Sequence, residues 1–113
     1  TRVYFPGLPS MGTRQNAIYN NQCKAPGAMI SFVVQGDEAG AFRFLNALKL
    51  VKLAVSLGSN ESLAQHPFSM THANVPDDEK LSTGVALGLV RLSVGIEHVE
   101  DLIDDLSEAL NHV

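Results

Sequence analysis

The stretch Leu89-Val-Arg-Leu-Ser-Val94 alternates between plain apolar side chains and a second set that contains one arginine. Successive side chains of a β-strand point to opposite faces of the sheet, so this alternation predicts a strand with two different faces. One predicted face carries Val90, Leu92 and Val94, and the other carries Leu89, Arg91 and Ser93. The strand therefore offers one face to an apolar core and places a single guanidinium on the other.

Arg91 is the strongest candidate for a ligand-binding residue. A guanidinium among apolar neighbours is costly to bury unless an anion meets it. Its planar array of N–H donors fits a carboxylate, which it can hold through two parallel hydrogen bonds. The alternative is an arginine at the rim of the sheet, whose long side chain reaches water. The spacing alone leaves both interpretations open.

Ser56 is a second candidate, because it lies in the segment Val55-Ser-Leu-Gly58 just before a glycine turn. Its hydroxyl could donate a hydrogen bond to a bound anion, or it could satisfy a nearby group of its own backbone. His66 and His72 are six residues apart, which matches neither a helical metal-binding pair nor zinc-finger spacing. We therefore expect no metal site.

The remaining periodicities predict an α+β domain with about four short strands in one sheet and helices packed on one side. Besides the strand at 89–94, strands are expected at residues 3–5, 29–34 and 53–56. The segment 29–34 is apolar and rich in β-branched residues, so it is predicted to be a buried strand. Helices are expected at residues 13–22, after Asp37 as N-cap, between Pro76 and Gly84, and at 99–111.

Two of the predicted helices have apolar stripes at helical spacing. The stripe of the helix after Asp37 is predicted to consist of Ala41, Phe42, Leu45 and Leu48. The stripe of the last helix is predicted to consist of Val99, Leu102, Ile103, Leu106 and Leu110, and its solvent face of Glu100, Asp101, Asp104, Asp105 and Glu108. Both stripes are expected to pack on the sheet.

Length and composition limit the possible functions. The 113 residues suggest one domain, and a content of 45% hydrophobic and 18% charged residues excludes a disordered segment. The formal charge is −4 and the eight Lys and Arg residues are scattered, so we expect no nucleic-acid partner. No apolar run approaches the ~20 residues that a membrane span needs. The single cysteine, Cys23, cannot form an intramolecular disulfide, which favours a cytoplasmic location.

Several motifs follow one another along the chain: Pro6-Gly-Leu-Pro-Ser10, Leu53-Ala-Val-Ser-Leu-Gly58, Glu61-Ser-Leu-Ala-Gln-His-Pro67, Ser69-Met-Thr-His72 and Leu89-Val-Arg-Leu-Ser-Val-Gly-Ile-Glu97. In this combination the chain resembles the pyridoxal-phosphate (PLP) enzymes of cysteine and methionine metabolism, the family of cystathionine and methionine γ-lyases. The likeness covers essentially all 113 residues. It implies fold type I, in which a large cofactor domain is followed by a small C-terminal domain, here residues 1–113.

The resemblance also implies roles for individual residues. Arg91 resembles the arginine that binds the substrate α-carboxylate, Ser56 the serine beside it, and Thr71 a threonine that lines the same cleft. Val55 stands where family members that act on cystathionine usually have an acidic residue. A valine there suits a thioether methyl group, so the likeness is closest to the methionine γ-lyase branch of the family.

The activity that this likeness implies is an α,γ-elimination, which converts L-methionine to methanethiol, 2-oxobutyrate and ammonia. No lysine of the chain stands in the Ser-x-Thr-Lys type motif that holds the cofactor in the family. No catalytic, cofactor-binding or metal-binding residue is therefore expected in this chain. PLP is expected on an N-terminal large domain that residues 1–113 lack, so the chain alone would be inactive. The family implies a homotetramer that acts on a sulfur amino acid.

Two alternatives stay open at this point. The chain could be the corresponding domain of a cystathionine γ-lyase or a cystathionine synthase, because the single residue Val55 decides that choice. It could instead be a free-standing, non-enzymatic module that binds an amino acid and regulates another protein.

Overall fold

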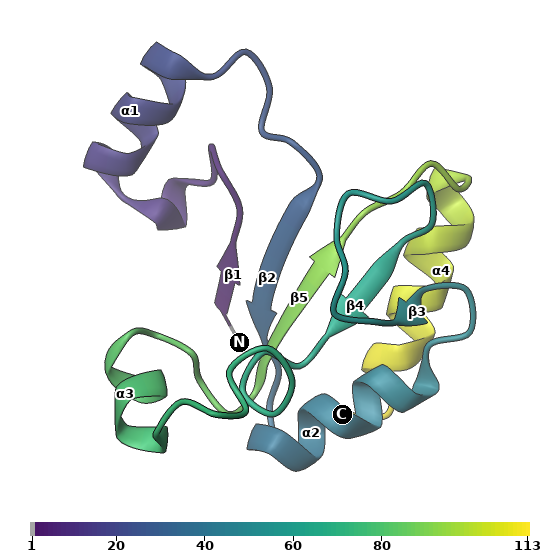
Figure 1. Ribbon diagram of the computed structural model, residues 1–113. Coiled ribbons are helices and arrows are strands. Elements are labelled where there is room, and N and C mark those ends of the chain that lie inside the picture. The colour runs from purple at the N-terminus through teal and green to yellow at the C-terminus, as the bar shows by residue number, and fades with distance from the viewer. Residues whose placement is uncertain (1) are drawn as a thin grey trace.

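A computed structural model describes residues 2–113 and contains one five-stranded sheet (Figure 1). Its strands are β1 (Arg2–Tyr4), β2 (Met29–Val33), β3 (Lys52–Leu53), β4 (Leu63–Gln65) and β5 (Leu89–Ser93). Their order across the sheet is β1-β2-β5-β4-β3, so β5 is the central strand. The pair β3–β4 is parallel, and the other neighbours are antiparallel. The predicted α+β class is confirmed, with five strands in place of about four.

Strand β4 is the one that the sequence prediction missed. It is three residues long and lies between two loops, so its alternation is too short to stand out from the surrounding sequence. Its register with β5 pairs Ala64 with Leu92 and Gln65 with Arg91. Directly opposed residues of neighbouring strands share a face of the sheet. Gln65 therefore lies on the same face as Arg91.

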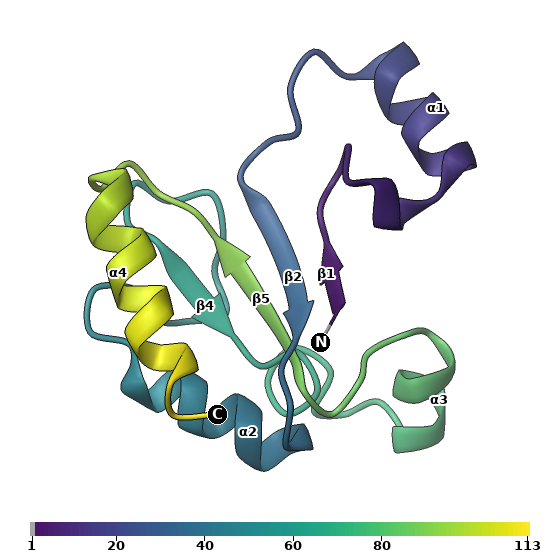
Figure 2. The same ribbon diagram turned by 180° about the vertical axis from the view of Figure 1, so that it is seen from behind.

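The helices of the described residues lie mainly at one side and at the margins of the sheet. They are η1 (Pro9–Met11, a 3-10 helix), α1 (Thr13–Gln22), α2 (Asp37–Ala47), α3 (Asp77–Ser82) and α4 (Val99–Leu110). α2 and α4 pack against each other, and Figure 2 shows α4 in front of the sheet when the molecule is seen from behind. α1 and α3 lie away from the middle of the sheet in both views. No helix among residues 2–113 is long and apolar enough to cross a membrane.

The hydrophobic core lies between the sheet and the pair α2–α4. Val90 and Leu92 of β5 are buried in it, as the alternation of this strand predicts. Phe32 of β2 meets Phe44 of α2 edge to face, with ring centroids 5.4 Å apart. Burial of each large apolar side chain stabilises the fold by ~1.5–3 kcal/mol. Strand β2 was predicted to be buried, but it is only half-buried, because α2 and α4 cover one face of the sheet.

Helix α2 departs from the prediction at its start and in its stripe. Gly36, in the left-handed conformation, occupies the N-cap position, and Asp37 is the first helical residue instead of the cap. Phe42 is exposed on 40% of its surface, whereas Phe44 is fully buried. The buried side chains of the helix are Ala41, Phe44 and Leu45. These three positions keep the i, i+3, i+4 spacing, which Phe42 does not.

Helix α4 also differs from its predicted pattern. Asp105 was assigned to the solvent face, but its side chain is buried. Its carboxylate accepts hydrogen bonds from the backbone N–H groups of Lys49, Leu50 and Val51, at 2.8, 3.0 and 2.9 Å. Three of the predicted core residues, Val99, Ile103 and Leu110, are instead exposed. The side of the helix that faces the core therefore differs from the predicted stripe, and its buried residues are Leu102, Asp105 and Ala109.

Candidate functional site

Arg91 lies in the middle of the sheet, on the face that α2 and α4 do not cover. Its direct partners across the two neighbouring strands are Ser31 of β2 and Gln65 of β4, and Ser31 in turn pairs with Tyr4 of β1. A row of polar residues thus crosses four strands. The interpretation of Arg91 as an arginine at the rim of the sheet is wrong, because β5 has a strand on each side.

The guanidinium of Arg91 is held by backbone carbonyl groups. Its Nη2 donates to the carbonyl oxygen of Val55 at 2.9 Å and to that of Ser56 at 3.3 Å. No carboxylate of residues 2–113 lies within ion-pair distance of it, since the ion pairs of this region are Lys80–Asp77 and His112–Glu108. The positive charge of Arg91 is therefore fixed in position but is not neutralised.

The structure brings three of the predicted binding residues together. Val55 and Ser56 meet Arg91 through their carbonyl groups, and the side chains of both are exposed. Val55 has 53% of its surface exposed, so its side chain is free to line a binding site. The contacts of these residues with a substrate remain predictions.

The loop of residues 54–62 forms one wall of this region and is tied down along its length. The Gly58 N–H donates to the Ser93 hydroxyl at 2.8 Å, and the Ile96 N–H donates to the Asn60 carbonyl at 2.8 Å. Gly58 has a φ of 72°, which favours glycine at this turn. Ser93 shares the Arg91 face of β5, so two side chains of that face, those of Arg91 and Ser93, hold the loop. The alternation of β5 already places Ser93 there, although its role was not predicted.

The far end of the same loop is held by Glu97. Its carboxylate accepts hydrogen bonds from the Ser62 N–H at 2.6 Å and from the Ser62 hydroxyl at 2.8 Å. The Ser62 oxygen also accepts from the Gly95 N–H at 2.8 Å. The two hydrogen bonds from Ser62 favour the ionised form and so lower the pKa of Glu97 below its ordinary value of 4.5.

Thr71 lies on a different segment from the Arg91 cluster. It belongs to the turns of residues 67–75, and its hydroxyl lies 3.0 Å from His72 Nδ1 and 3.5 Å from the Pro67 carbonyl. Its side chain is exposed, and no hydrogen bond within residues 2–113 joins it to Arg91. The role of Thr71 in the cleft thus remains a prediction.

The contacts of His66 indicate that it stabilises the fold. It is buried, with Nε2 lying 2.7 Å from the Leu87 carbonyl and Nδ1 2.7 Å from the Ser69 hydroxyl. Because a carbonyl can only accept, Nε2 carries a proton, and in the neutral ring Nδ1 then accepts from the Ser69 hydroxyl. The contact of Nε2 therefore ties the segment after β4 to the loop before β5, while the contact of Nδ1 lies within the segment of His66 itself.

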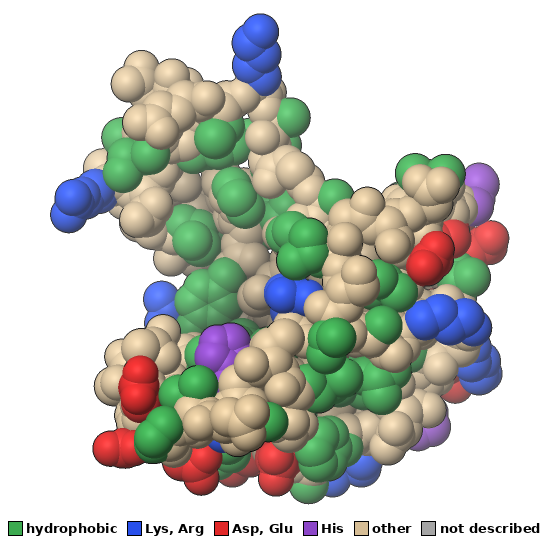
Figure 3. Space-filling view, viewed as in Figure 1, with side chains coloured by type: hydrophobic (Ala, Val, Ile, Leu, Met, Phe, Trp, Pro, Cys, Tyr) green, Lys and Arg blue, Asp and Glu red, His purple; other side chains and the backbone are tan. Residues whose placement is uncertain are grey.

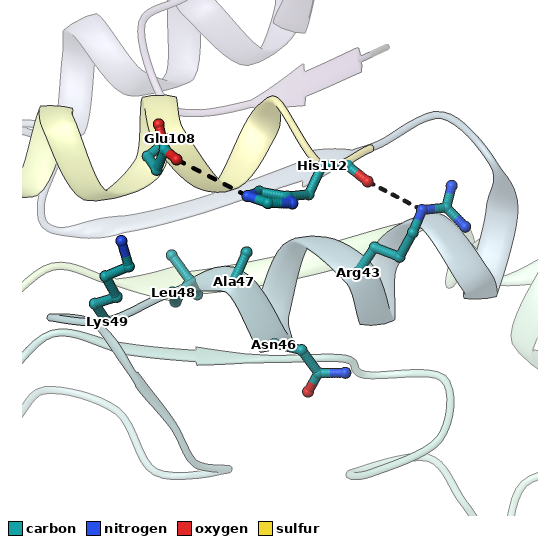
Figure 4. A pocket seen from close by; sticks show the side chains of 7 residues that line it. All are labelled: Arg43, Asn46, Ala47, Leu48, Lys49, Glu108 and His112. Carbon is teal, nitrogen blue, oxygen red and sulfur yellow. Dashed lines mark hydrogen bonds and ion pairs between the residues drawn. The ribbon is translucent and has the colours of Figure 1, made fainter.

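The face of the molecule that carries the Arg91 cluster is hollowed. Figure 3 shows a hollow between the part that contains α1 and the part that contains α3, with basic side-chain atoms visible near its inner end. A separate groove of about 610 Å³ lies between α2 and α4, on the opposite side of the sheet (Figure 4). Its lining residues are Arg43, Asn46, Ala47, Leu48, Lys49, Glu108 and His112. That groove shares no residue with the Arg91 cluster.

Comparison with known proteins identifies the relatives of this chain. A family model described as Cys/Met metabolism PLP-dependent enzyme matches residues 1–111. The L-methionine γ-lyase of Pseudomonas deceptionensis is 49% identical over 108 residues, which are 96% of this chain and 27% of that protein. The cystathionine γ-lyase of Dictyostelium discoideum is 46% identical over 110 residues, which are 97% of this chain and 28% of that protein. The chain thus spans little more than a quarter of these curated relatives.

Solved structures show the same fold. The crystal structure of cystathionine γ-lyase from Lactobacillus plantarum in complex with L-serine matches with a TM-score of 0.91 and 38% identity. The match covers 100% of this chain and 29% of that chain. The cystathionine γ-lyase CalE6 of Micromonospora echinospora matches with a TM-score of 0.90 and 40% identity over 98% of this chain.

The lysines of the chain lie away from the Arg91 cluster. Lys80 is buried, with Nζ 3.0 Å from an Asp77 carboxylate oxygen and 4.1 Å from the centre of the Phe68 ring. The other lysines of the chain, Lys24, Lys49 and Lys52, are exposed. None of the four lies on β4, on β5 or in the loop of residues 54–62.

Proposed function

The chain belongs to the family of Cys/Met metabolism PLP-dependent enzymes, and on this premise we propose that it is the C-terminal, substrate-binding domain of a carbon–sulfur lyase. In this proposal Arg91 binds the α-carboxylate of a sulfur amino acid. The observation that carries it is a guanidinium at the centre of the sheet, held in place by carbonyl groups and without a carboxylate partner among residues 2–113.

The geometry of Arg91 supports the binding of an anion. Its Nη2 is occupied by the backbone carbonyl groups of Val55 and Ser56, whereas no backbone carbonyl or hydroxyl group of residues 2–113 accepts a hydrogen bond from Nη1 or Nε. Charge-assisted hydrogen bonds from these nitrogens to a carboxylate are short and strong. Because the guanidinium is already held, little side-chain freedom is lost on binding. A fixed carboxylate orients the rest of an amino acid for reaction.

The proposed reaction is the α,γ-elimination of L-methionine to methanethiol, 2-oxobutyrate and ammonia. The methionine γ-lyases among the relatives support this choice. We place Val55 beside the thioether, because its exposed side chain offers an apolar surface next to the guanidinium. Ser56 and Thr71 complete the proposed site. The complex of a related cystathionine γ-lyase with L-serine supports an amino acid as the ligand.

A second candidate substrate is cystathionine. Two cystathionine γ-lyases are 46% and 44% identical to this chain, close to the values for the methionine γ-lyases. Both substrates carry an α-carboxylate, so the proposed role of Arg91 applies to either. The side chain at position 55 is the feature that we propose to discriminate between them.

The rest of the enzyme is part of the proposal. We place PLP, which stabilises carbanions in such enzymes, on a large N-terminal domain of the full-length protein, and we propose that residues 1–113 have no activity alone. The assembly is proposed to be a cytoplasmic homotetramer. The support for a further, cofactor-binding part of the protein is the family membership together with the share of each relative that this chain spans.

Replacing Arg91 by alanine in the full-length, PLP-loaded enzyme tests the proposed function. The loss of a charge-assisted hydrogen-bonded pair is worth ~1.5–3 kcal/mol, so kcat/KM for L-methionine is expected to fall by roughly 10- to 150-fold. Most of this change is expected in KM, because the carboxylate is held in the ground state as well.

Arg43→Ala is the matched control. Arg43 lies on α2, where its Nε donates to the His112 carbonyl at 3.0 Å on the other side of the sheet. This variant is expected to retain the kinetics of the unmodified enzyme. Equal kinetics of the Arg91→Ala and Arg43→Ala variants would refute the assignment of Arg91.

A further inference from the structure

Gln65 is a buried polar residue whose side chain contacts Arg91. It ends β4, pairs with Arg91 in the register of the sheet and has only 1% of its surface exposed. A buried side-chain amide costs free energy unless it makes compensating polar contacts. The other two residues of β4, Leu63 and Ala64, are apolar and buried. The amide of Gln65 therefore needs a specific polar partner at this position.

The partner is the guanidinium. With its oxygen directed at the cation, as the charges favour, the Gln65 amide oxygen lies 3.1 Å from Nη1, 3.2 Å from Nη2 and 3.2 Å from Nε of Arg91. An atom outside the plane of a guanidinium can be equally distant from its three nitrogens, but an atom beside one edge cannot. The oxygen of Gln65 therefore lies over the face of the guanidinium, near its central carbon.

This position has two consequences for the charge. A neutral oxygen over the face attracts the cation without neutralising it, and it leaves the in-plane N–H groups of Nη1 and Nε available. The carbonyl groups of Val55 and Ser56 fix one edge of the guanidinium at Nη2. An edge contact and a face contact together determine the plane of the guanidinium, which either contact alone would leave free to rotate.

We propose that Gln65 is a positioning residue for substrate binding, which acts by fixing the plane of the Arg91 guanidinium so that a free edge faces the incoming carboxylate. This inference rests on the proposed function of Arg91. It adds that the affinity for the carboxylate depends on a residue that itself does not touch the substrate. The sequence alone gives no sign of it, because β4 is too short to be recognised.

The test uses Gln65→Met in the full-length, PLP-loaded enzyme. Methionine keeps the length and approximate volume of the side chain but lacks the amide oxygen. We expect KM for L-methionine to rise by roughly 3- to 30-fold, a coupling of the size found between side chains in contact, and kcat to change less. Leu63→Val is the matched control, since it perturbs the same strand while an aliphatic side chain offers the guanidinium no acceptor, and its KM is expected to stay within about twofold.

A double-mutant cycle separates a positioning role from a purely structural one. In the Arg91→Ala background, Gln65→Met is expected to cause no further rise of KM, because Gln65 acts only through the guanidinium. If Gln65→Met fails to fold, Gln65→Asn provides the same test, since it keeps an amide but withdraws it by one methylene from Arg91.

The outcomes are distinguishable from those that bear on the proposed function. If Arg91→Ala raises KM while Gln65→Met and Gln65→Asn leave it unchanged, the role of Gln65 is refuted and that of Arg91 stands. An effect of Gln65→Met that persists undiminished without Arg91 also refutes the positioning role. If Arg91→Ala has no effect, the proposed function itself fails, and the role of Gln65 fails with it.

Discussion

At the scale of single residues, Arg91 is a cation that neutral oxygen atoms hold in place. The contacts of its guanidinium are the carbonyls of Val55 and Ser56 and the amide of Gln65. A carboxylate in their place would form an internal ion pair and compete with a ligand. Neutral acceptors instead fix the orientation and leave the full charge for an anion. This arrangement suits a binding site better than it suits a structural ion pair.

The side chain at position 55 is predicted to set the substrate preference. In the full-length enzyme, Val55→Glu places a carboxylate beside the proposed site, where it can pair with the distal ammonium group of cystathionine. We expect the ratio of kcat/KM for cystathionine to that for L-methionine to increase by roughly tenfold, which corresponds to ~1.4 kcal/mol. Steady-state kinetics on both substrates measure this ratio.

Leu57→Glu is the control for a general effect of charge. Leu57 lies on the same loop and is 55% exposed, which closely matches the 53% of Val55. The specificity assignment is wrong if Val55→Glu leaves the ratio unchanged, or if Leu57→Glu changes it equally.

Glu97 is predicted to make the stability of the loop depend on pH. Its folded-state pKa is lowered by the hydrogen bonds from Ser62, so the stabilisation is fully present above the ordinary value of 4.5. As the pH falls below that value, the unfolded state takes up the proton first, and the stabilisation disappears as the pH passes the lower folded-state pKa.

Urea unfolding of the chain and of its Glu97→Gln variant checks this dependence. The variant is expected to be less stable at pH 7, because an amide can accept only one of the two hydrogen bonds from Ser62. The difference is expected to shrink at pH 3. The exposed Glu100→Gln is the control, and a difference for Glu97→Gln that is independent of pH would contradict the account.

At the scale of elements, the sequence predicts best where one periodicity is long enough to dominate. The alternation of β5 assigns Val90 to the core and Arg91 to the open face, and both assignments are confirmed. Helix α1 has the predicted bounds Thr13–Gln22. β4, with three residues, carries too little pattern, so the contact between Gln65 and Arg91 could not be predicted.

Other failures occur where tertiary contacts override a local pattern. Asp105 follows the acidic residues of α4 in sequence, but its carboxylate binds the backbone of residues 49–51 from a distance of more than fifty positions along the chain. Periodicity places an acid on the wet side of a helix and carries no information about such a partner. Likewise, Val55 and Ser56 meet Arg91 through their carbonyl groups, which no pattern of side chains can reveal.

Asp105 is predicted to stabilise the connection between α2 and β3. Asp105→Asn replaces one carboxylate oxygen by an N–H₂ group, so at least one backbone N–H of residues 49–51 loses its acceptor. A buried donor without a partner costs ~1–3 kcal/mol, and urea unfolding should show a loss of stability of that size. Asp104→Asn, at an exposed neighbouring position, is expected to change the stability by less than ~0.5 kcal/mol. Equal effects of the two variants would contradict the role of Asp105.

At the scale of the whole molecule, helices and site occupy opposite sides of the sheet. α2 and α4 cover one face, while the Arg91 cluster lies on the hollowed face that they leave free (Figure 3). Exposed apolar residues include Ile96, Val99 and Ile103, near or on α4. Exposed apolar surface of this kind marks contact regions in proteins. The further domain that we propose for the full-length protein would cover such surface.

Residues 1–113 made alone are predicted to associate and to lack lyase activity. Association is expected because the apolar side chains of Val99 and Ile103 on α4 are exposed. Sedimentation velocity should therefore show species larger than a monomer. Ile103→Lys, which places a charge on this exposed surface, is expected to reduce the association. Turnover of L-methionine by the chain with added PLP would contradict the proposed division of roles. A compact monomer that binds amino acids tightly would instead favour a regulatory module.

The central claim is that Arg91 binds the carboxylate of the substrate. The most direct measurement is a crystal structure of the full-length, PLP-loaded enzyme with an amino-acid ligand. The account predicts a carboxylate about 2.7–2.9 Å from Nη1 or Nε of Arg91, with Nη2 still bound to the carbonyls of Val55 and Ser56. A ligand whose carboxylate is held by other residues, with the guanidinium of Arg91 facing solvent, would contradict it.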